Sequence, residues 1–297
     1  MATFKITLTY DGTDFVGWQR QASGTSIQGL LEDALRALDQ RDVPVIGAGR
    51  TDAGVHALGQ VASFTLNRSI DGDVLLRAVN ARLPDSVKVV AADLVGATFH
   101  ARFDATRKVY RYRIWNTEIM SPFERAYAWH VPAPLDVDAM QAAAFLIEGR
   151  RDFAAFQAAG SSTRSSEREV FSSVVIAHHQ GSPSAPGIFD AARQPVPPNQ
   201  PDLPDTSHLP HLPDQPRLLY SRGALVEYEV TGSGFLRHMV RNIVGSLVEI
   251  GRGRRPVEWM ATIIDARDRT LSGPTAPPHG LVLVAVEYDA ASPAPSV

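Results

Sequence analysis

The first hundred residues alternate strand-like and helix-like segments in an order that few folds can accommodate. Residues 4–10 alternate apolar and polar side chains, as a half-buried strand does, whereas residues 27–38 place apolar side chains on one helical stripe. Further strands are expected at 43–46, 60–65 and 87–95, and a second helix at 71–83. This order predicts a ferredoxin-like or RRM-like α+β layer, in which helices pack on one face of an antiparallel sheet.

The second half of the chain continues this mixture of strands and helices without detectable sequence repetition. Strands are expected at 108–115, 169–177, 224–231 and 281–288, and helices at 135–148, 235–250 and 257–267. At the start of the first helix, Thr25 and Gln28 have the spacing of a capping box. Trp18, a few residues earlier, suits the core of the fold as well as it suits stacking on a base.

The composition limits both the class of protein and its chemistry. The chain has 297 residues, enough for two ordinary domains or one large one, and its 44% hydrophobic and 21% charged residues are typical of a folded protein with a core. Because there is no cysteine, disulfides, thiolate chemistry and zinc sites with Cys ligands are excluded. The start has no apolar signal region, and no run approaches the length of a membrane span. We therefore expect a soluble cytoplasmic protein with no membrane partner.

Positive charge is concentrated locally, although the net charge is −3. Two stretches are strongly basic: residues 102–113, with Arg102, Arg107, Lys108, Arg111 and Arg113, and residues 237–255, with Arg237, Arg241, Arg252, Arg254 and Arg255. Such stretches either form an ordinary solvated face or, if they converge in the fold, bind phosphates.

Residues 180–216 differ in composition from the rest of the chain. Ten of the 21 prolines fall in these 37 residues, which show little apolar periodicity. They predict a flexible or polyproline-like insert without a catalytic role. The last residues, 291–297, are rich in Ala, Pro and Ser and are expected to be a disordered tail.

A glycine-rich loop at residues 49–57 contains the best candidate for a catalytic group. Three nearby glycines surround a single carboxylate, Asp52, and glycine permits tight backbone paths that other residues resist. In an extended stretch, Arg50 and Asp52 point to one face, where the guanidinium can hold the carboxylate ionised. An oriented, ionised aspartate on a rigid loop is a possible nucleophile. The alternative is that Asp52 only forms the turn by bonding to its own backbone, the usual function of aspartate in such loops.

The expected strand at 108–115 carries two tyrosines on one face. Tyr110 and Tyr112 alternate with Arg111 and Arg113, so the tyrosines share one side of the sheet and the arginines the other. The residue types alone favour core aromatics with exposed hydroxyls.

The expected helix at 235–250 has an apolar stripe with basic residues beside it. Arg237 and Arg241 are four positions apart, so they should form one edge next to the buried face. Arginines in that position can border a cleft.

Residues 50–57, Arg-Thr-Asp-Ala-Gly-Val-His-Ala, resemble the active-site motif of the TruA family of tRNA pseudouridine synthases. Other strings are similar to motifs of that family, in matching order: residues 10–13, 17–19 and 26–28 near the start, then 108–115, then 234–245. The resemblance covers about residues 4–288. It excludes residues 180–216, where members of the family usually have a short connection.

The resemblance implies isomerisation of uridine to pseudouridine in tRNA, at about positions 38 to 40 of the anticodon stem-loop. It implies two RRM-like halves, expected here at 1–106 and 107–290, whose sheets join into one large, mainly antiparallel sheet with the catalytic cleft between the halves. It also implies a homodimer whose subunits share a tRNA.

The resemblance and the chemistry together suggest roles for individual residues. Asp52 is expected to be the nucleophile, and the family's counterpart of Tyr110 lines the active site and contacts the target uridine. The uridine must leave its stack before attack, and Arg50 is a candidate to fill the vacated space or to hold a phosphate. Arg241, expected to bind substrate together with Arg237, can pair with Asp52 or with a phosphate. Because isomerisation oxidises nothing and imports no group, neither a cofactor nor a metal is expected.

Two other classes of function compete with this interpretation. A non-catalytic RNA-binding protein on RRM-like sheets would not need Arg50-Thr51-Asp52, and RNP-type aromatic strings are absent. A nucleosidase could use Asp52 as a glycosidase does, but glycosidases normally use a pair of carboxylates, and no second acid accompanies Asp52 in its loop.

Overall fold

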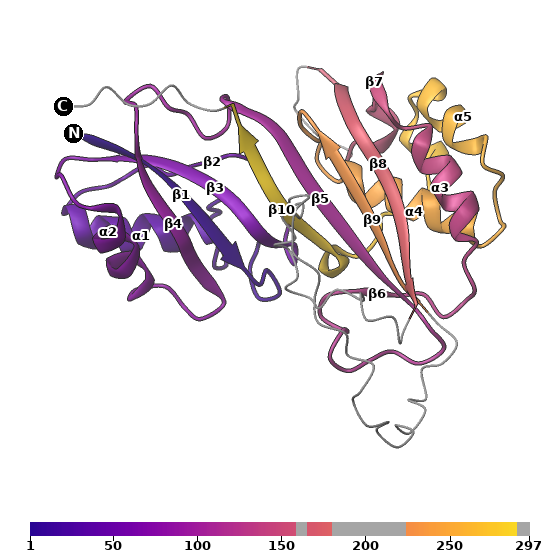
Figure 1. Ribbon diagram of the computed structural model, residues 1–297, viewed down its shortest axis with the longest axis horizontal. Helices are drawn as coiled ribbons and strands as arrows, with labels where there is room; N and C mark the ends of the chain where they lie inside the picture. The colour runs from indigo at the N-terminus through magenta and orange to yellow at the C-terminus, as the bar shows by residue number, and fades with distance from the viewer. Residues whose placement is uncertain (159–164, 180–223, 290–297) are drawn as a thin grey trace, which may run out of the picture.

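The computed structural model describes residues 1–158, 165–179 and 224–289. These residues form a mixed α/β fold with one large sheet (Figure 1). In these residues the sheet has ten strands, almost all antiparallel, and five α-helices accompany it. The expected fold class is therefore confirmed. The proline-rich segment 180–216 and the tail 291–297 lie outside the described residues.

The first part of the chain has the predicted order of elements. It consists of β1 (Ala2–Tyr10), α1 (Ile27–Asp39), β2 (Ile46–Gly47), β3 (His56–Leu66), α2 (Gly72–Asn80) and β4 (Val87–Val95). The expected strand at 43–46 is reduced to the two residues of β2, which pair with Ser63 and Ala62 of β3. Because β3 begins at His56, the glycine-rich loop ends two residues earlier than expected.

The capping box expected at the start of α1 is not formed. The N-cap is Ser26, whose hydroxyl accepts a hydrogen bond from the backbone N–H of Gly29 at 3.2 Å. The Gln28 side chain instead accepts from the N–H of Arg20 and donates to the carbonyl of Val45, both at 3.0 Å. Gln28 thus fastens the helix to the two segments that flank it in the sequence.

The second part adds the other six described strands and three α-helices. It consists of β5 (Ala105–Asn116), β6 (Trp129–His130), α3 (Val137–Phe145), β7 (Gly149–Asp152), β8 (Glu167–His179), β9 (Ala224–Gly232), α4 (Met239–Gly251), α5 (Trp259–Ala266) and β10 (Leu281–Tyr288). The main path across the sheet is β4-β1-β3-β10-β5-β9-β8-β7, with β2 and β6 paired at its sides.

The last strand, β10, lies between the strands of the two parts (Figure 1). It runs parallel to β3, with Val282 opposite His56 and Leu283 opposite Ala57, and antiparallel to β5. A strand from the end of the chain therefore makes the sheet continuous. The division into halves at residues 106 and 107 remains a prediction.

The helices share one face of the sheet. Buried side chains from all five helices belong to a single apolar cluster, which also contains alternate residues of β1 and of β5. Trp18, 3% exposed, is part of this cluster, so it belongs to the core and not to a stacking surface. No helix in the described part of the chain is both long and apolar enough to span a membrane.

Candidate active site

The loop that carries Asp52 is held in place by contacts with the N-terminal part of the chain. The hydroxyls of Tyr10 and Thr51 lie 2.8 Å apart, and the N–H of Trp18 donates to the carbonyl of Thr51 at 3.0 Å. Gly17 has a φ of +107°, and a Cβ at this position would lie 2.6 Å from the Thr51 oxygen. The backbone can approach the loop this closely only because residue 17 has no side chain.

Asp52 contacts two basic side chains from the start of α4. Its Oδ2 accepts from Nη1 of Arg241 at 3.3 Å and lies 3.5 Å from Nε2 of His238. Arg241 is itself anchored, because its Nε donates to the carbonyl of Ala276 at 2.7 Å. Of the two partners considered for Arg241, the structure has Asp52. The carboxylate is oriented by a segment almost two hundred residues away in the sequence.

The expected pairing of Arg50 with Asp52 is wrong. Arg50 is exposed and makes no ion pair with any described residue, whereas Asp52 is only partly exposed. The Asp52 side chain also forms no hydrogen bond to its own loop backbone among the described contacts. The turn-former alternative therefore has no geometric support either, and the cation that contacts Asp52 is Arg241.

His238 is a site residue that sequence reasoning missed. It precedes the first residue of α4, with a left-handed φ of 62°, and this turn brings its imidazole to Asp52. Burial lowers the pKa of His238, and the negative charge of Asp52 opposes that shift only in part, so the imidazole is neutral at pH 7. A histidine three positions before Arg241 was the available signal, but its use depends on a turn that the helical pattern hides.

Because of the same turn, the helix expected at 235–250 begins four residues later than predicted. Because α4 begins at Met239, Arg237 lies outside it and does not form a helical edge with Arg241. Arg237 is exposed, and its charge contributes to the lowered pKa of His238.

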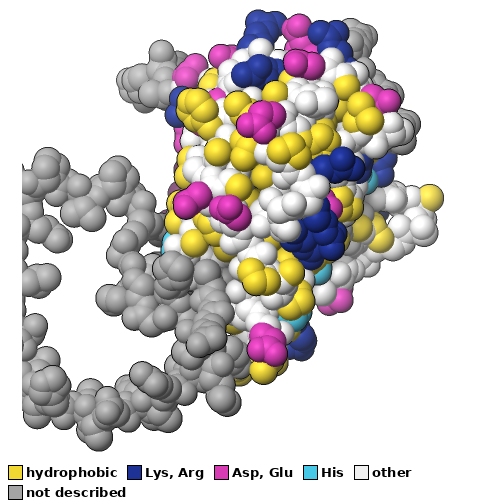
Figure 2. Space-filling view, turned by 90° about the vertical axis from the view of Figure 1, so that its right-hand side faces the viewer, with side chains coloured by type: hydrophobic (Ala, Val, Ile, Leu, Met, Phe, Trp, Pro, Cys, Tyr) yellow, Lys and Arg dark blue, Asp and Glu magenta, His cyan; other side chains and the backbone are white. Residues whose placement is uncertain are grey.

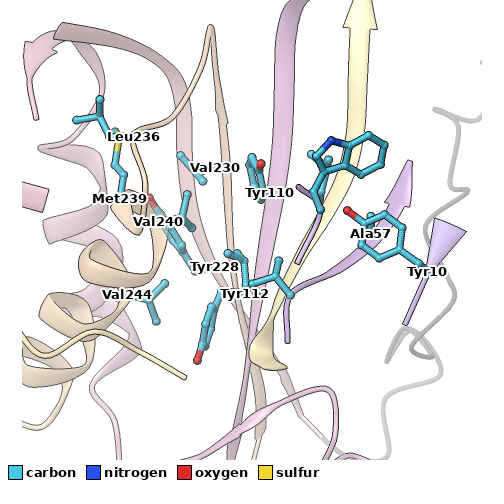
Figure 3. Close-up of a cluster of buried hydrophobic side chains, with 14 of the residues drawn as sticks. Tyr10, Ala57, Tyr110, Tyr112, Tyr228, Val230, Leu236, Met239, Val240 and Val244 are labelled. Carbon is cyan, nitrogen blue, oxygen red and sulfur yellow. The ribbon is translucent and has the colours of Figure 1, made fainter. Parts of the chain in front are cut away.

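Tyr110 reaches the site from β5 and lies between the strands of the first part and α4 (Figure 3). It is 7% exposed and packs edge-on against Phe235, with ring centroids 5.2 Å apart. The hydroxyls of the other buried tyrosines bond to protein groups: Tyr10 to Thr51, Tyr112 to the Pro277 carbonyl and Tyr228 to Ser173. The Tyr110 hydroxyl has no hydrogen-bond partner among the described residues.

Burial also fixes the protonation state of Tyr110. It raises the pKa of the phenol above its ordinary value, and Tyr10 and the negative charge of Asp52 raise it further. The side chain therefore offers an apolar ring and a protonated hydroxyl that has no hydrogen-bond partner in the described part of the chain, within the electrostatic influence of Asp52. Such a group can stack on a base and donate a hydrogen bond, but it is not a phenolate base at neutral pH.

Much of the positive charge in the two basic stretches is neutralised within the protein. Arg111 pairs with Glu229 at 2.9 Å, and the buried Arg113 pairs with Glu124 at 2.7 Å and with Glu227 at 3.4 Å. In the second stretch, Arg252 and Arg254 both pair with Glu249. On the face turned to the viewer in Figure 2, basic side chains are interspersed with acidic and apolar ones. The charges of Arg111, Arg113, Arg252 and Arg254 are therefore compensated by glutamates within the protein.

A cavity of about 330 Å³ lies beside the motif but is not lined by Asp52. His56, the histidine of residues 50–57, forms part of its wall together with Asp11. The imidazole accepts at Nδ1 from the N–H of Gly12 at 3.0 Å and donates from Nε2 to the carbonyl of His279 at 3.1 Å. His56 thus joins three segments of the chain. The catalytic cleft expected between the halves remains a prediction.

Within the described ranges, no group of three or more His, Asp or Glu side chains is arranged to hold a metal ion. The polar side chains that contact Asp52 are those of Arg241 and His238, and the charge of Asp52 acts on the phenol of Tyr110. Arginine and a protonated phenol are hydrogen-bond donors, so this arrangement can orient a carboxylate and contact a polar planar substrate.

The sequence matches the family model described as tRNA pseudouridine synthase over residues 6–104 and 143–289. A protein of Myxococcus xanthus described as tRNA pseudouridine synthase A is 40% identical over 294 residues, which cover 99% of this chain and 95% of that protein. A relative with the same description from Solidesulfovibrio magneticus is 42% identical over 98% of this chain and 92% of its own length. Another, from Limosilactobacillus fermentum, is 38% identical over 100% of this chain and 99% of its own length.

Proposed function

Since the chain belongs to the tRNA pseudouridine synthase family, we propose that it isomerises uridine to pseudouridine at about positions 38 to 40 of the tRNA anticodon stem-loop, with Asp52 as nucleophile. Pseudouridine synthases are isomerases, and tRNA is the substrate that the family description names. The position in the tRNA and the role of Asp52 are parts of the proposal.

The observation that carries the proposal is the contact between Asp52 and Arg241. It joins the loop before β3 to the start of α4 at 3.3 Å, with the unpartnered hydroxyl of Tyr110 nearby. A carboxylate that serves only a turn needs no such partner. A carboxylate that attacks a substrate must be held in one orientation, and an anchored guanidinium provides that restraint.

The reaction needs only groups that this site contains. The bond between C1′ and N1 of the uridine breaks, a bond between C1′ and C5 forms, one proton leaves C5 and one is gained at N1. No electrons are transferred to an acceptor, so the atoms and electrons of the product are the same as those of the uridine. Asp52 can attack C1′ of the ribose or C6 of the base, and either attack gives a covalent adduct that later releases the carboxylate.

The target uridine has to leave its stack before Asp52 can reach it. Tyr110 can stack on the extruded base through its ring and donate from its hydroxyl. Arg50 and Arg237 are exposed and make no ion pair with described residues, which suits contacts with RNA. Loss of tRNA affinity in Arg50→Met and Arg237→Met would support this assignment, and unchanged affinity in both would oppose it.

The competing functions predict different products. A nucleosidase normally needs a second carboxylate beside the first, whereas the side chains that contact Asp52 here are Arg241 and His238. A protein that only binds RNA has no use for an oriented carboxylate below the binding surface. Of the three classes, the isomerase gives a role to the oriented carboxylate, to Arg241 and to Tyr110.

The decisive experiment incubates the protein with unmodified tRNA and maps pseudouridine in the product. We expect pseudouridine at about positions 38 to 40, and Asp52→Asn should abolish it while keeping the fold and tRNA binding. Asp42→Asn is the matched control, because the Asp42 side chain is 86% exposed and pairs only with Arg36. Free uracil in place of pseudouridine would support the nucleosidase, and appreciable turnover by pure Asp52→Asn would remove Asp52 from the role of nucleophile.

We also propose that the protein acts in the cytoplasm as a homodimer whose subunits share one tRNA. The resemblance of the motifs supports this assembly, and the chain mass of 32.2 kDa gives a clear test. Sedimentation equilibrium should give twice the chain mass, and a monomer that retains full activity would refute the homodimer.

A further inference from the structure

One group of cations, centred on Lys108, has no acidic partner among the described residues. Lys108, Arg102 and Arg168 make no ion pair with any described residue, unlike Arg111 and Arg113 further along β5. Lys108 is also unusual in the composition, because the chain contains lysine only at positions 5, 88 and 108 and uses arginine elsewhere.

The register of the sheet places two of these cations, Lys108 and Arg168, on the face of Tyr110, and the charge of Arg102, just before β5, acts on both. Lys108 is two residues before Tyr110 on β5, so both side chains leave the same side of the strand, about 7 Å apart along it. Across the sheet, Lys108 is opposite Gly232 of β9, and Gly232 is opposite Val170 of β8. Arg168, two residues before Val170, therefore also lies on this face.

Distances connect Lys108 directly to the candidate active site. Its Nζ donates to the carbonyl of Ala48 at 2.7 Å, immediately before the loop that carries Asp52. A Cβ placed on Gly49 would lie 3.7 Å from this Nζ and 3.8 Å from the hydroxyl of Tyr110. The space above Gly49 is thus bounded by an amine on one side and an unpartnered hydroxyl on the other.

The ammonium group of Lys108 has N–H donors without an acceptor among the described residues, and its charged form is destabilised. An ammonium group has three N–H donors, and one bond to Ala48 accounts for one of them. Burial lowers the pKa of Lys108 to about 8, and the positive charges of Arg102 and Arg168 contribute to the shift. Burial and Arg102 likewise lower the pKa of Arg168. Three cations that repel one another without an acid are the arrangement expected of a site that binds an external anion.

We propose that Lys108, Arg102 and Arg168 form a binding site for a phosphate of the RNA backbone next to the target uridine. The inference rests on the proposed function for the identity of the anion, because phosphodiesters are the anionic groups of an RNA that reaches Asp52 and Tyr110. Lys108 is the central member: it donates to the phosphate while remaining tied to the loop of the nucleophile, so that binding of the backbone and placement of Asp52 are coupled.

The first test measures the affinity for unmodified tRNA as a function of salt in wild type and Lys108→Met. Each phosphate contact contributes a slope of about 0.7 to 0.9 in log affinity against log salt. Raising salt from 50 to 200 mM should therefore weaken wild-type binding about threefold more than it weakens binding by Lys108→Met. Lys5→Met is the matched control, because Lys5 pairs with Asp93 near the other edge of the sheet, and its slope should equal that of wild type. Equal slopes in all three proteins would overturn the proposal.

A second measurement uses the wild-type protein, so that it does not depend on whether Lys108→Met folds. Reductive methylation with a ¹³C label gives resonances for three lysines and the terminal amine, and Lys108→Arg identifies the resonance of Lys108. In the free protein this resonance should titrate near pH 8, below the ordinary value for a lysine of about 10.4. Saturating unmodified tRNA should move its midpoint to higher pH, since a phosphate stabilises the ammonium form. A midpoint that stays the same or falls in the complex would refute the phosphate contact.

Mapping pseudouridine in the same samples separates this inference from the proposed function. Wild type that forms pseudouridine but shows no involvement of Lys108 in the salt slope or the titration would overturn the phosphate site alone. Wild type that binds tRNA through Lys108 without forming pseudouridine would support the site and refute the proposed reaction.

Discussion

Replacing Arg113 by methionine should destabilise the fold without changing how RNA binds. The Arg113 side chain is 6% exposed and pairs with Glu124 at 2.7 Å and with Glu227 at 3.4 Å. Methionine retains much of the packing volume but leaves two carboxylates without their main cation. Breaking a buried pair in this way costs about 3–5 kcal/mol.

The neighbouring contacts favour the lower end of this range. Glu227 retains His178 at 3.2 Å and a distant Arg111 at 3.9 Å, and Glu124 is 17% exposed, so water can reach it. We therefore expect a loss of about 3 kcal/mol, which corresponds to a fall in Tm of about 6–12 °C for a domain of this size.

Urea unfolding of wild type, Arg113→Met and Arg107→Met measures this difference. Arg107 is on the same strand, is half exposed and pairs with Glu287 at 3.6 Å, so its replacement should cost less than about 1 kcal/mol. The double variant Arg113→Met/Glu227→Met should recover part of the loss, because an apolar pair can replace a buried ionic one. If Arg113→Met were as stable as Arg107→Met and had a smaller salt slope for tRNA binding, the argument would fail and Arg113 would be a phosphate contact.

Three further predictions follow from the site. Tyr110→Phe should keep the stability of wild type within about 0.5 kcal/mol, since no hydrogen bond is lost, and should slow single-turnover isomerisation; an unchanged rate would restrict Tyr110 to stacking. Burial lowers the pKa of His56, His238 and His279 below the unfolded value of about 6.5, so the unfolded state takes up protons first as the pH falls. Stability in urea should therefore be complete above about pH 6.5 and decrease below it, by up to about 1.4 kcal/mol per pH unit for each histidine, whereas constant stability between pH 7.5 and 5.5 would contradict this. Gly17→Ala should lower Tm and turnover together, because its Cβ would lie 2.6 Å from the Thr51 oxygen at a φ of +107°; full activity would show that the loop tolerates displacement.

Local patterns along the chain were enough to predict the strands and helices and to identify the motif that contains Asp52. The order of strands and helices in the first hundred residues follows from hydrophobic periodicity, which is a local property, and most expected segments overlap observed ones. Residues 50–57 also marked Asp52 as the candidate nucleophile, because the residue types and their spacing are all contained in one contiguous string.

The groups that surround Asp52, and the charges that have no acidic partner among the described residues, follow from contacts between distant segments. Arg241 and His238 reach it from α4, and the placement of His238 depends on a left-handed turn that the helical pattern does not indicate. The sequence also treated Lys108 and Arg113 as members of one basic stretch, whereas the sheet gives Arg113 two glutamates and leaves Lys108 with none. Periodicity fixes the face of a strand on which a side chain lies, but its partners come from strands and turns that are distant in the sequence, and only the folded chain brings them together.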